Sequence, residues 1–488
     1  MRNLWAGSAV LAALLAAPAA SAQQSPAAPT TIALGDWQLA PTMEVRVRGE
    51  YRHDAPDLGG LDNFGRQTPR ERDAWLVMER SRVGLGAERG ALRAQFTLQD
   101  ARALGSPAPN ATLVGARGVG QLAPYEAFVE MRSSGARPTY LRLGRQAVVW
   151  GEGRLVGNAD FSPVGRSLDA ARVHGAVGNF DFEALAAVLE APSPLGAAFG
   201  DRVGGTTSGV QLYGVTAKWT VDPLLRVELF GLARIARSRG EELDGSAFQV
   251  QRAVGERYTA SLRISGDAKG WAYGAEGAYQ AGSADAVRFG GSDIAAWAAA
   301  GHVQKTLEQV LLTPTLRVNA SYASGDDGKG RYKQFDPLLA DPQRFHGAMD
   351  LFSWSNMLDL GGKAQIVPWT DTAFSVAYRY AQLAKAQGEW VGGYLTTVGS
   401  GTVPPVLTIS PTPAQRIDST LGHELDVGFS WRPWMPLELR AGWSGLLLGD
   451  GARGIMAAAA RGKTDDANNV SAATIAHYAF AQATLTMP

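Results

Sequence analysis

The stretch that decides the fold is MEVRVRGEY, residues 43–51. Met43, Val45 and Val47 stand at odd positions, and the charged residues between them stand at even positions. Successive side chains of an extended chain point to opposite faces, so a two-residue period predicts a β-strand with one apolar and one charged face.

The same alternation recurs along the chain, in segments that resemble each other in length and in the charge of their polar face. These segments are 91–99, 224–235, 257–265 and 423–432. A soluble sandwich also alternates, but it would rarely carry so many charges on the polar face of so many strands. The pattern therefore favours strands that face lipid on one side and water on the other.

Connections between the expected strands alternate between short and long, which is typical of an outer-membrane barrel. The short ones are 88–91, 134–138, 178–179, 221–223, 267–270, 368–371 and 433–436. The long ones, rich in Gly, Pro and polar residues, are 54–72, 100–123, 149–168, 191–208, 237–256, 324–354, 384–421 and 449–472. The sequence predicts an all-β fold, a transmembrane antiparallel β-barrel of about 18 strands with short periplasmic turns and long extracellular loops.

The N-terminus has the features of a secretory signal peptide. Arg2 precedes the apolar run AVLAALLAA (9–17), and a small-residue cleavage motif, Ala-Ser-Ala, ends at Ala22. No later run is long and apolar enough for a transmembrane helix. We expect a signal peptide, a short periplasmic segment and an outer-membrane barrel, at 1–22, 23–40 and 41–488.

Composition narrows the class of function. The 488-residue chain has a formal net charge of zero and no cysteine, so disulfides, thiolate metal sites and cysteine nucleophiles are absent. Overall charge therefore predicts no nucleic-acid partner. Hydrophobic residues make up 45% of the chain and glycine is abundant, which suits a barrel in the bacterial outer membrane.

Residues at alternate positions of a strand share a face, and we call each such set a parity. If the apolar parity faces lipid, the charged parity lines the lumen. Arginine far outnumbers lysine, and guanidinium groups bind carboxylates with two parallel hydrogen bonds. These charges could also pair across neighbouring strands and close the lumen. We expect an open or gated anion-preferring channel, with Glu424 and Asp426 as supporting acids and with pore residues Arg46, Arg48, Arg82, Arg93, Arg142, Arg172 and Arg440.

A glycine-rich segment at 147–170 is expected to fold into the lumen and narrow it. Arg154, Arg166 and Asp169 would then lie at the constriction, where glycines allow the backbone to approach a ligand closely. Arg145 has the parity of the apolar residues before it, so we expect a bulge or a strand end there. The alternative is an extracellular loop held together by its own ion pairs.

Two segments resemble the alginate-export family of outer-membrane proteins. GRQAVVWGEGRLVGNADFSPVGRSLDAARVHG (144–175) is similar to the family pattern Gly-Arg-Gln, Gly-x-Gly/Asp-Arg-Leu-x-Gly and Gly-Arg-Ser/Thr-Phe/Leu-Asp-x-x-Arg. LGHELDVGFSWRPWMPLELRAGWSGLLLGDG (421–451) is similar to the family's Gly-x-Glu-x-Asp strand and the strand that follows it.

The resemblance implies a monomeric barrel of about 18 strands whose arginine-rich constriction passes an anionic polyuronate. It implies ligand contacts for Arg145, Arg154, Arg166 and Arg172, with Glu152 and Asp169 holding those arginines apart. Partners implied are outer-membrane lipid, an anionic polysaccharide or carboxylated solute, and periplasmic export proteins. We expect no cofactor, and passage by passive, charge-selective diffusion.

Other classes of function fit less well. An outer-membrane hydrolase needs a Ser–His pair near the interface, but the chain has only six histidines and no Gly-x-Ser-x-Gly motif. Asp326-Asp327-Gly328 could hold calcium, although its spacing matches no recognised loop and a solvated loop is the expectation. A plugged structural barrel and an uptake porin for small organic anions remain as alternatives.

Overall fold

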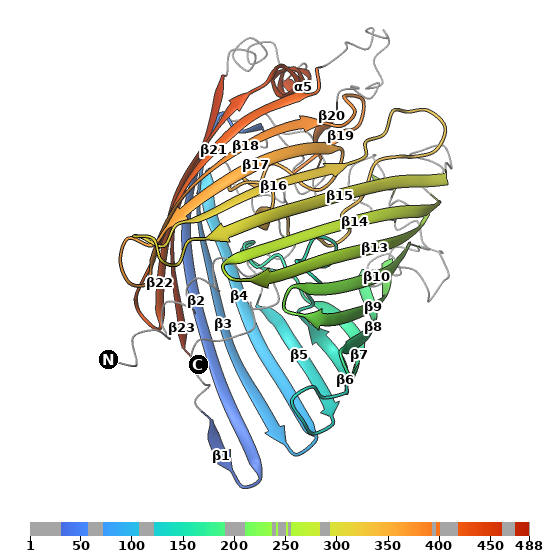
Figure 1. The fold of residues 1–488 in the computed structure, drawn as a ribbon, viewed down its shortest axis with the longest axis vertical. Coiled ribbons are helices and arrows are strands. Elements are labelled where there is room, and N and C mark those ends of the chain that lie inside the picture. Colours follow the sequence, from blue (N-terminus) through green and yellow to red (C-terminus); the bar gives the residue numbers. More distant parts are fainter. Residues whose placement is uncertain are drawn as a thin grey trace.

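The chain folds into a closed antiparallel β-barrel of 18 strands (Figure 1). The computed structural model describes residues 31–56, 72–106, 122–190, 210–236, 241–242, 250–251, 255–283, 293–392, 397–400, 418–460 and 474–487. The barrel strands are β2 (Trp37–His53), β3 (Asp73–Arg89), β4 (Leu92–Ser106), β5 (Ala123–Arg132), β6 (Tyr140–Gln146), β7 (Leu168–Val177), β8 (Phe180–Glu190), β9 (Val210–Asp222), β10 (Leu225–Ala236), β13 (Gly255–Ala268), β14 (Trp271–Ser283), β15 (Asp293–Thr306), β16 (Thr315–Ala323), β17 (Met357–Ile366), β18 (Thr372–Leu383), β21 (Thr420–Trp434), β22 (Leu437–Leu448) and β23 (Ile475–Met487).

The first and last barrel strands close the ring. β2 pairs with β3 on one side and with β23 on the other, in a register that joins Met43 to Met487 and His53 to His477. Every other barrel strand pairs with its neighbours in sequence order. The predicted fold class is therefore confirmed, and closure removes the open edges that a sheet would otherwise expose.

Side chains alternate between the two faces as the sequence predicts. In β2, Val47 and Tyr51 are 44% and 46% exposed on the outer face, whereas Arg46 and Arg48 are 6% and 1% exposed on the inner face. A lipid-facing apolar surface around a charged interior is the arrangement of transmembrane barrels.

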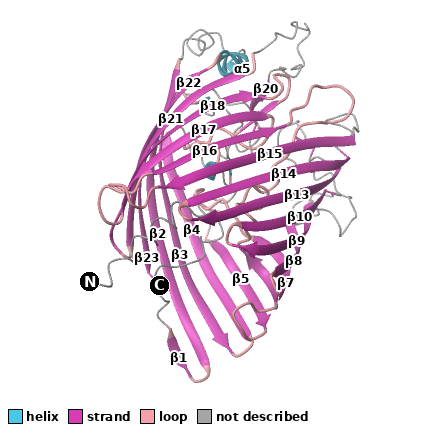
Figure 2. Ribbon diagram, viewed as in Figure 1, coloured by secondary structure: helices cyan, strands magenta, loops and turns pink. Residues whose placement is uncertain are grey.

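Smaller elements lie at the two ends of the barrel (Figure 2). The short strand β1 (Ile32–Leu34) folds back against the start of β2 at the end with short turns. At the other end lie helix α5 (Asp450–Ala460) and the hairpins β11–β12 (Glu241–Glu242, Val250–Gln251) and β19–β20 (Glu389–Val391, Thr397–Ser400). No helix in the described residues is long and apolar enough to cross a membrane.

Some boundaries differ from those expected. β2 begins at Trp37, so strand pairing reaches into the segment 23–40 that we expected to be periplasmic. The sequence patterns also missed the turn at 307–314, and the connection 284–292 between β14 and β15. The expected signal peptide, 1–22, lies outside the described residues.

Aromatic residues near the strand ends form a girdle on the outer face, with Tyr125 as an exception. Trp75, Trp219 and Trp271 are 47%, 43% and 52% exposed. The pairing of β4 with β5 shifts register between Thr97 and Leu98, opposite Tyr125. This irregularity turns the Tyr125 ring inward, where the Arg82 guanidinium lies 3.5 Å from the ring centroid.

Candidate functional site

Two long loops meet inside the barrel and form one layer across part of the lumen. They connect β6 to β7 (147–167, hereafter the first loop) and β16 to β17 (324–356, hereafter the second loop). Val156 and Leu339 form a parallel β-bridge, and the Gly157 and Leu339 amides donate to the Leu339 and Leu155 carbonyls at 2.8 and 2.9 Å. The expectation that the first loop folds inward is met, whereas the contribution of the second loop is new.

Glycines let these loops approach other parts of the chain closely. A Cβ on Gly214 of β9 would lie 2.4 Å from the Trp150 ring, and one on Gly347 would lie 2.4 Å from a Glu424 carboxylate oxygen. A side chain on Gly214 would collide with the rigid Trp150 ring, and one on Gly347 would displace the Glu424 carboxylate. The layer is therefore fitted to the barrel at specific points.

Arginines of β2 hold the backbone of the first loop. Arg46 donates to the Asp160 and Ser162 carbonyls, both at 2.6 Å, and Arg48 donates to the Phe161 carbonyl at 2.6 Å. The Arg48 guanidinium also stacks 3.9 Å from the centroid of the Phe161 ring. Both arginines were predicted as pore residues, and the structure places both against the loop rather than in open lumen.

Arginines of β3 bind the acid of the same loop. Arg80 and Arg82 contact Asp160 Oδ1 at 2.9 and 3.1 Å, and Arg80 also contacts Glu44 at 2.5 Å. Burial raises the pKa of the Asp160 carboxyl, but the Arg80 and Arg82 guanidiniums outweigh that effect and hold this pKa well below its usual range. Asp160 is therefore ionised throughout the physiological range.

Arg166 joins the two loops. Its Nη1 donates to the Gly157 carbonyl at 2.9 Å in the first loop and to the Leu339 and Ala340 carbonyls in the second loop. The structure thus brings Arg166 to the predicted constriction, where its Nη1 binds protein carbonyls.

Arg154 lies in the same layer and is 5% exposed. Its Nε is 3.5 Å from Glu152, its guanidinium is 4.0 Å from the centroid of the Phe345 ring, and its Nη1 has no hydrogen-bond partner. Glu152 also accepts from Arg263 of β13 at 2.9 Å. Burial raises the pKa of Glu152, but Arg154 and Arg263 outweigh that effect and lower this pKa to about 2.

The wall formed by β5 to β8 carries paired charges. Arg142 binds Glu130 at 2.6 Å, and Arg172 binds Glu183 at 2.6 Å. Glu183 also accepts the indole N–H of Trp150. Arg142 and Arg172 face the lumen as predicted, and each of them is neutralised by a protein carboxylate.

Arg145 and Asp169 lie on the outer face, which corrects two predictions. β6 continues in regular register through Arg145, which pairs with Ala127 on one side and Asp169 on the other. No bulge or strand end turns Arg145 inward, so its parity keeps it with Leu141 and Leu143. The two side chains form an exposed ion pair of 2.9 Å, away from the constriction.

The remaining predicted residues are two acids of β21 and two arginines that form no ion pair within the described part of the chain. Glu424 is 1% exposed and accepts the Met349 amide at 3.1 Å, so it anchors the second loop. Asp426, on the same inner face of β21, follows two positions later. Arg93 and Arg440 face inward and have neither an ion pair nor a hydrogen bond among the described residues.

Several inner residues were not among the predicted ligand contacts. Arg80, Arg52 and Arg317 have the inward parity, and that signal was available in the sequence. Lys363 was missed because Gly361 and Gly362 interrupt the alternation of β17.

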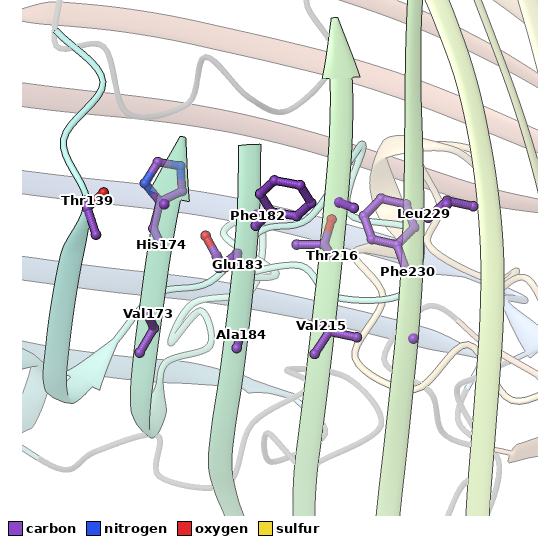
Figure 3. Close-up of a pocket in the computed structure, with 13 residues that line it drawn as sticks. Thr139, Val173, His174, Phe182, Glu183, Ala184, Val215, Thr216, Leu229 and Phe230 are labelled. Atoms are coloured by element: carbon purple, nitrogen blue, oxygen red, sulfur yellow. The ribbon is translucent and has the colours of Figure 1, made fainter. Parts of the chain in front are cut away.

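A groove lies on the strand wall, outside the loop layer. Figure 3 shows it along β7 to β10, where Val173, Ala184 and Val215 belong to the outward parity and His174 and Glu183 to the inward parity. Its volume is about 680 Å³ and its lining is mainly apolar. No described arginine lines this groove, so it is separate from the inward-facing arginines of the lumen.

The two aspartates considered for calcium have protein partners. Asp327 binds Lys333 Nζ at 2.9 Å, and Asp326 accepts the Gly328 and Lys333 amides, both at 3.0 Å. Among the described residues, no cluster of three or more His, Asp or Glu side chains is placed to hold a metal ion.

Comparisons with known proteins agree with the barrel. A family model described as alginate export matches residues 38–454. The outer-membrane protein OpdK from Pseudomonas aeruginosa has a TM-score of 0.52 at 10% identity, covering 91% of this chain and 98% of that one. OccK9 (OpdG) of the same species has a TM-score of 0.52 at 13% identity, covering 92% of this chain and 98% of that one. The structure of OpdK with vanillate has a TM-score of 0.50 at 12% identity, covering 91% of this chain and 98% of that one. No curated protein matches the chain.

Proposed function

The chain belongs to the alginate-export family and forms a channel in the bacterial outer membrane, and from this premise we propose that it passes carboxylated solutes by passive, charge-selective diffusion. The solute class that we favour is an anionic polysaccharide of the alginate type. No covalent step is involved.

The observation that carries this proposal is the unpaired positive charge on the inner wall. Arg93 lies near the start of β4 and Arg440 near the start of β22, so both are in the half of the lumen that adjoins the short turns. Neither forms an ion pair with a described acid, unlike Arg142 and Arg172. Arg93 is flanked in register by Glu88 and Glu130, so the less compensated charge is that of Arg440. Uncompensated cations on a low-dielectric wall attract anions and repel cations.

A second candidate is uptake of small organic anions. The interlocked loops support it, because the contacts between Val156 and Leu339 and between Arg166 and both loops narrow the lumen. A narrow lumen admits a small anion more readily than a polymer, while using the same wall charges.

Single-channel recording in a planar bilayer tests both candidates. Under a salt gradient, we expect a reversal potential that reports anion selectivity, and block of the current by oligouronates added on one side. Anion selectivity without oligouronate block, but with block by a small organic carboxylate, would support the second candidate. Cation selectivity would contradict both.

We further propose that the barrel is a monomer; β2 and β23 close the ring within one chain, so no second chain is needed to complete the pore. Light scattering of the detergent-solubilised protein would give the mass of one chain. A trimer mass would contradict this.

A further inference from the structure

We propose that three neighbouring turns at the periplasmic end of the barrel insert into the headgroup layer of the membrane's periplasmic leaflet. These turns connect β15 to β16 (307–314), β17 to β18 (367–371) and β21 to β22 (435–436). The exposed apolar side chains at these turns, hereafter the apolar rim, are those of Val310, Leu311, Leu312, Trp369, Trp434 and Met435. The occupant of this surface is a lipid bilayer, and the inference does not depend on the solute that the channel passes.

The first of these turns presents an apolar tip. Val310 and Leu312 are 50% and 38% exposed. Leu311 is 85% exposed, more than any other large hydrophobic residue in the described part of the chain. Keeping apolar surface in water costs about 25 cal/mol per Å². A group of exposed apolar side chains therefore marks a surface that contacts another protein or a membrane.

The backbone of this turn holds the tip in a fixed conformation. Leu312 and Thr313 have φ angles of 66° and 44°, in the left-handed region that residues other than glycine rarely adopt. The Val310 amide donates to the Leu307 carbonyl at 3.1 Å, and the Thr313 amide donates to the Val310 carbonyl at 3.0 Å. An unfavourable backbone conformation that hydrogen bonds nevertheless fix is a feature of functional turns.

Backbone hydrogen bonds join the three turns into one surface. The Val367 amide donates to the Leu312 carbonyl at 2.8 Å, and the Arg432 amide donates to the Asp371 carbonyl at 2.9 Å. The turns that follow β15 and β17 therefore lie side by side, at the left of the barrel in Figure 1. The apolar tip of one turn is thus continued by the next.

Two tryptophans and a methionine extend the apolar tip. Trp369 and Trp434 are 57% and 55% exposed, and Met435 is 52% exposed. The indole ring has an apolar body and a polar N–H, so tryptophan concentrates at the boundary between lipid and water. These residues fit the headgroup layer better than they fit bulk water.

The turns of β1 to β6 at the same end of the barrel carry exposed charges instead. Arg89 binds Asp36 at 2.9 Å, and Arg137 binds Asp181 at 2.7 Å. The side chains of the first pair are 53% and 76% exposed. Such ion pairs are stable in water, and transfer into lipid would cost their hydration. The apolar rim therefore occupies one sector of the periplasmic end.

Continuity with the lipid-facing wall selects a bilayer as the occupant. Leu316 and Val318, which follow the turn on the outer face of β16, are 53% and 64% exposed. On β15, Lys305 Nζ lies 5.0 Å from the centroid of the Trp271 ring, a pairing typical of the membrane–water boundary. Apolar surface thus runs from the wall past this boundary onto the Leu311 tip. A bilayer covers the wall and the tip together, whereas a soluble partner would cover the tip alone.

The test places a fluorophore at the tip. The chain has no cysteine, so Leu311→Cys provides a single site for the polarity-sensitive dye NBD. The labelled protein is folded into vesicles of phosphatidylethanolamine and phosphatidylglycerol, with and without lipids that carry a nitroxide near the headgroup. We expect blue-shifted emission and strong quenching by the nitroxide lipids, because the tip lies among the headgroups.

Ala91→Cys is the matched control. Ala91 is exposed in the turn between β3 and β4, two residues after Arg89, at the same end of the barrel. We expect the label at this position to emit as it does in water. The nitroxide lipids should quench it several-fold less than they quench the label at Leu311→Cys.

The outcomes decide between a bilayer and a soluble partner. Quenching at Leu311→Cys but not at Ala91→Cys supports insertion of the apolar rim. An unquenched, water-like label at Leu311→Cys overturns it and leaves the tip to a soluble partner. Equal quenching at both positions also overturns it, because the contact would then not be specific to the apolar turns. None of these measurements uses a solute, so their failure is distinct from failure of the proposed function.

Discussion

Asp160 shows how a single side chain fixes the first loop. Its carboxylate binds Arg80 and Arg82, while its own carbonyl accepts from Arg46. Arg80 is 1% exposed, and a buried guanidinium that loses an acid partner costs more than an exposed one. The arginines that look like ligand contacts in the sequence thus use much of their binding capacity within the protein.

We predict that Asp160→Asn loosens the first loop by about 2 kcal/mol, through loss of charge-assisted hydrogen bonds. Hydrogen exchange of residues 155–165 should accelerate, and single-channel current should become noisier. Asp169→Asn is the control, since it removes an exposed ion pair on the outer face. Equal exchange in both variants would mean that Asp160 does not hold the loop.

At the scale of elements, the two inward loops behave as one layer. They share a β-bridge at Val156 and Leu339, and the chain has no cysteine of its own. Cysteines at bridged positions lie within the Cα separation that a disulfide requires.

We therefore predict that the double variant Val156→Cys/Leu339→Cys forms a disulfide on mild oxidation. Conductance should not change, because the bond joins segments that already touch. Mass spectrometry of a digest under non-reducing conditions would detect the linked peptides. Ser167→Cys/Leu339→Cys, lacking a bridge, should stay reduced. A drop in current on oxidation would indicate that the loops normally separate.

The second loop should also respond to pH. Burial raises the pKa of Asp350 to about 7, with Arg52 opposing this effect, and burial raises the pKa of Asp341 to about 6, opposed by Arg344. Arg48 and Glu50 of β2 also face Asp350. Because both folded-state values lie above the ordinary value of about 4, these two carboxyls favour the packed loop at low pH, and this contribution is lost as pH rises through 6 to 7. Burial also lowers the pKa of His346 in the same loop to about 4, which opposes this trend but does not cancel two carboxyls.

We predict faster hydrogen exchange of residues 338–352 at pH 8 than at pH 5, after correction for the intrinsic rate. Asp350→Asn should reduce that difference, because an amide does not ionise. An unchanged difference in this variant would assign the pH response to other groups.

At the scale of the whole molecule, the alternation of faces governs where a charge is tolerated. Val318 is 64% exposed on the outer face, and its neighbour Asn319 points inward. We predict that Val318→Arg destabilises the barrel by about 2 kcal/mol or more, whereas Asn319→Arg costs much less. Urea titration in lipid vesicles would measure both. Similar losses would contradict the assignment of the faces.

The sequence predicts the barrel because its two-residue period is local and repeated. Parity likewise places Arg46, Arg142 and Arg440 on the inner wall. Parity does not predict which group an inward charge binds. Arg80, for example, binds Asp160, and this contact depends on how the first loop, distant in sequence, folds back against the wall. Errors occur where the local pattern misleads, as at Tyr125, which a register shift turns inward.

Closure of β2 against β23 also has a consequence for the order of assembly. The edge of β2 is complete early in synthesis, but its partner is the final strand of the chain. Until β2 and β23 pair, any sheet that the other strands form has two unsatisfied edges. Exposed strand edges invite pairing with other chains, so the final closing step is the one that protects the barrel from such pairing.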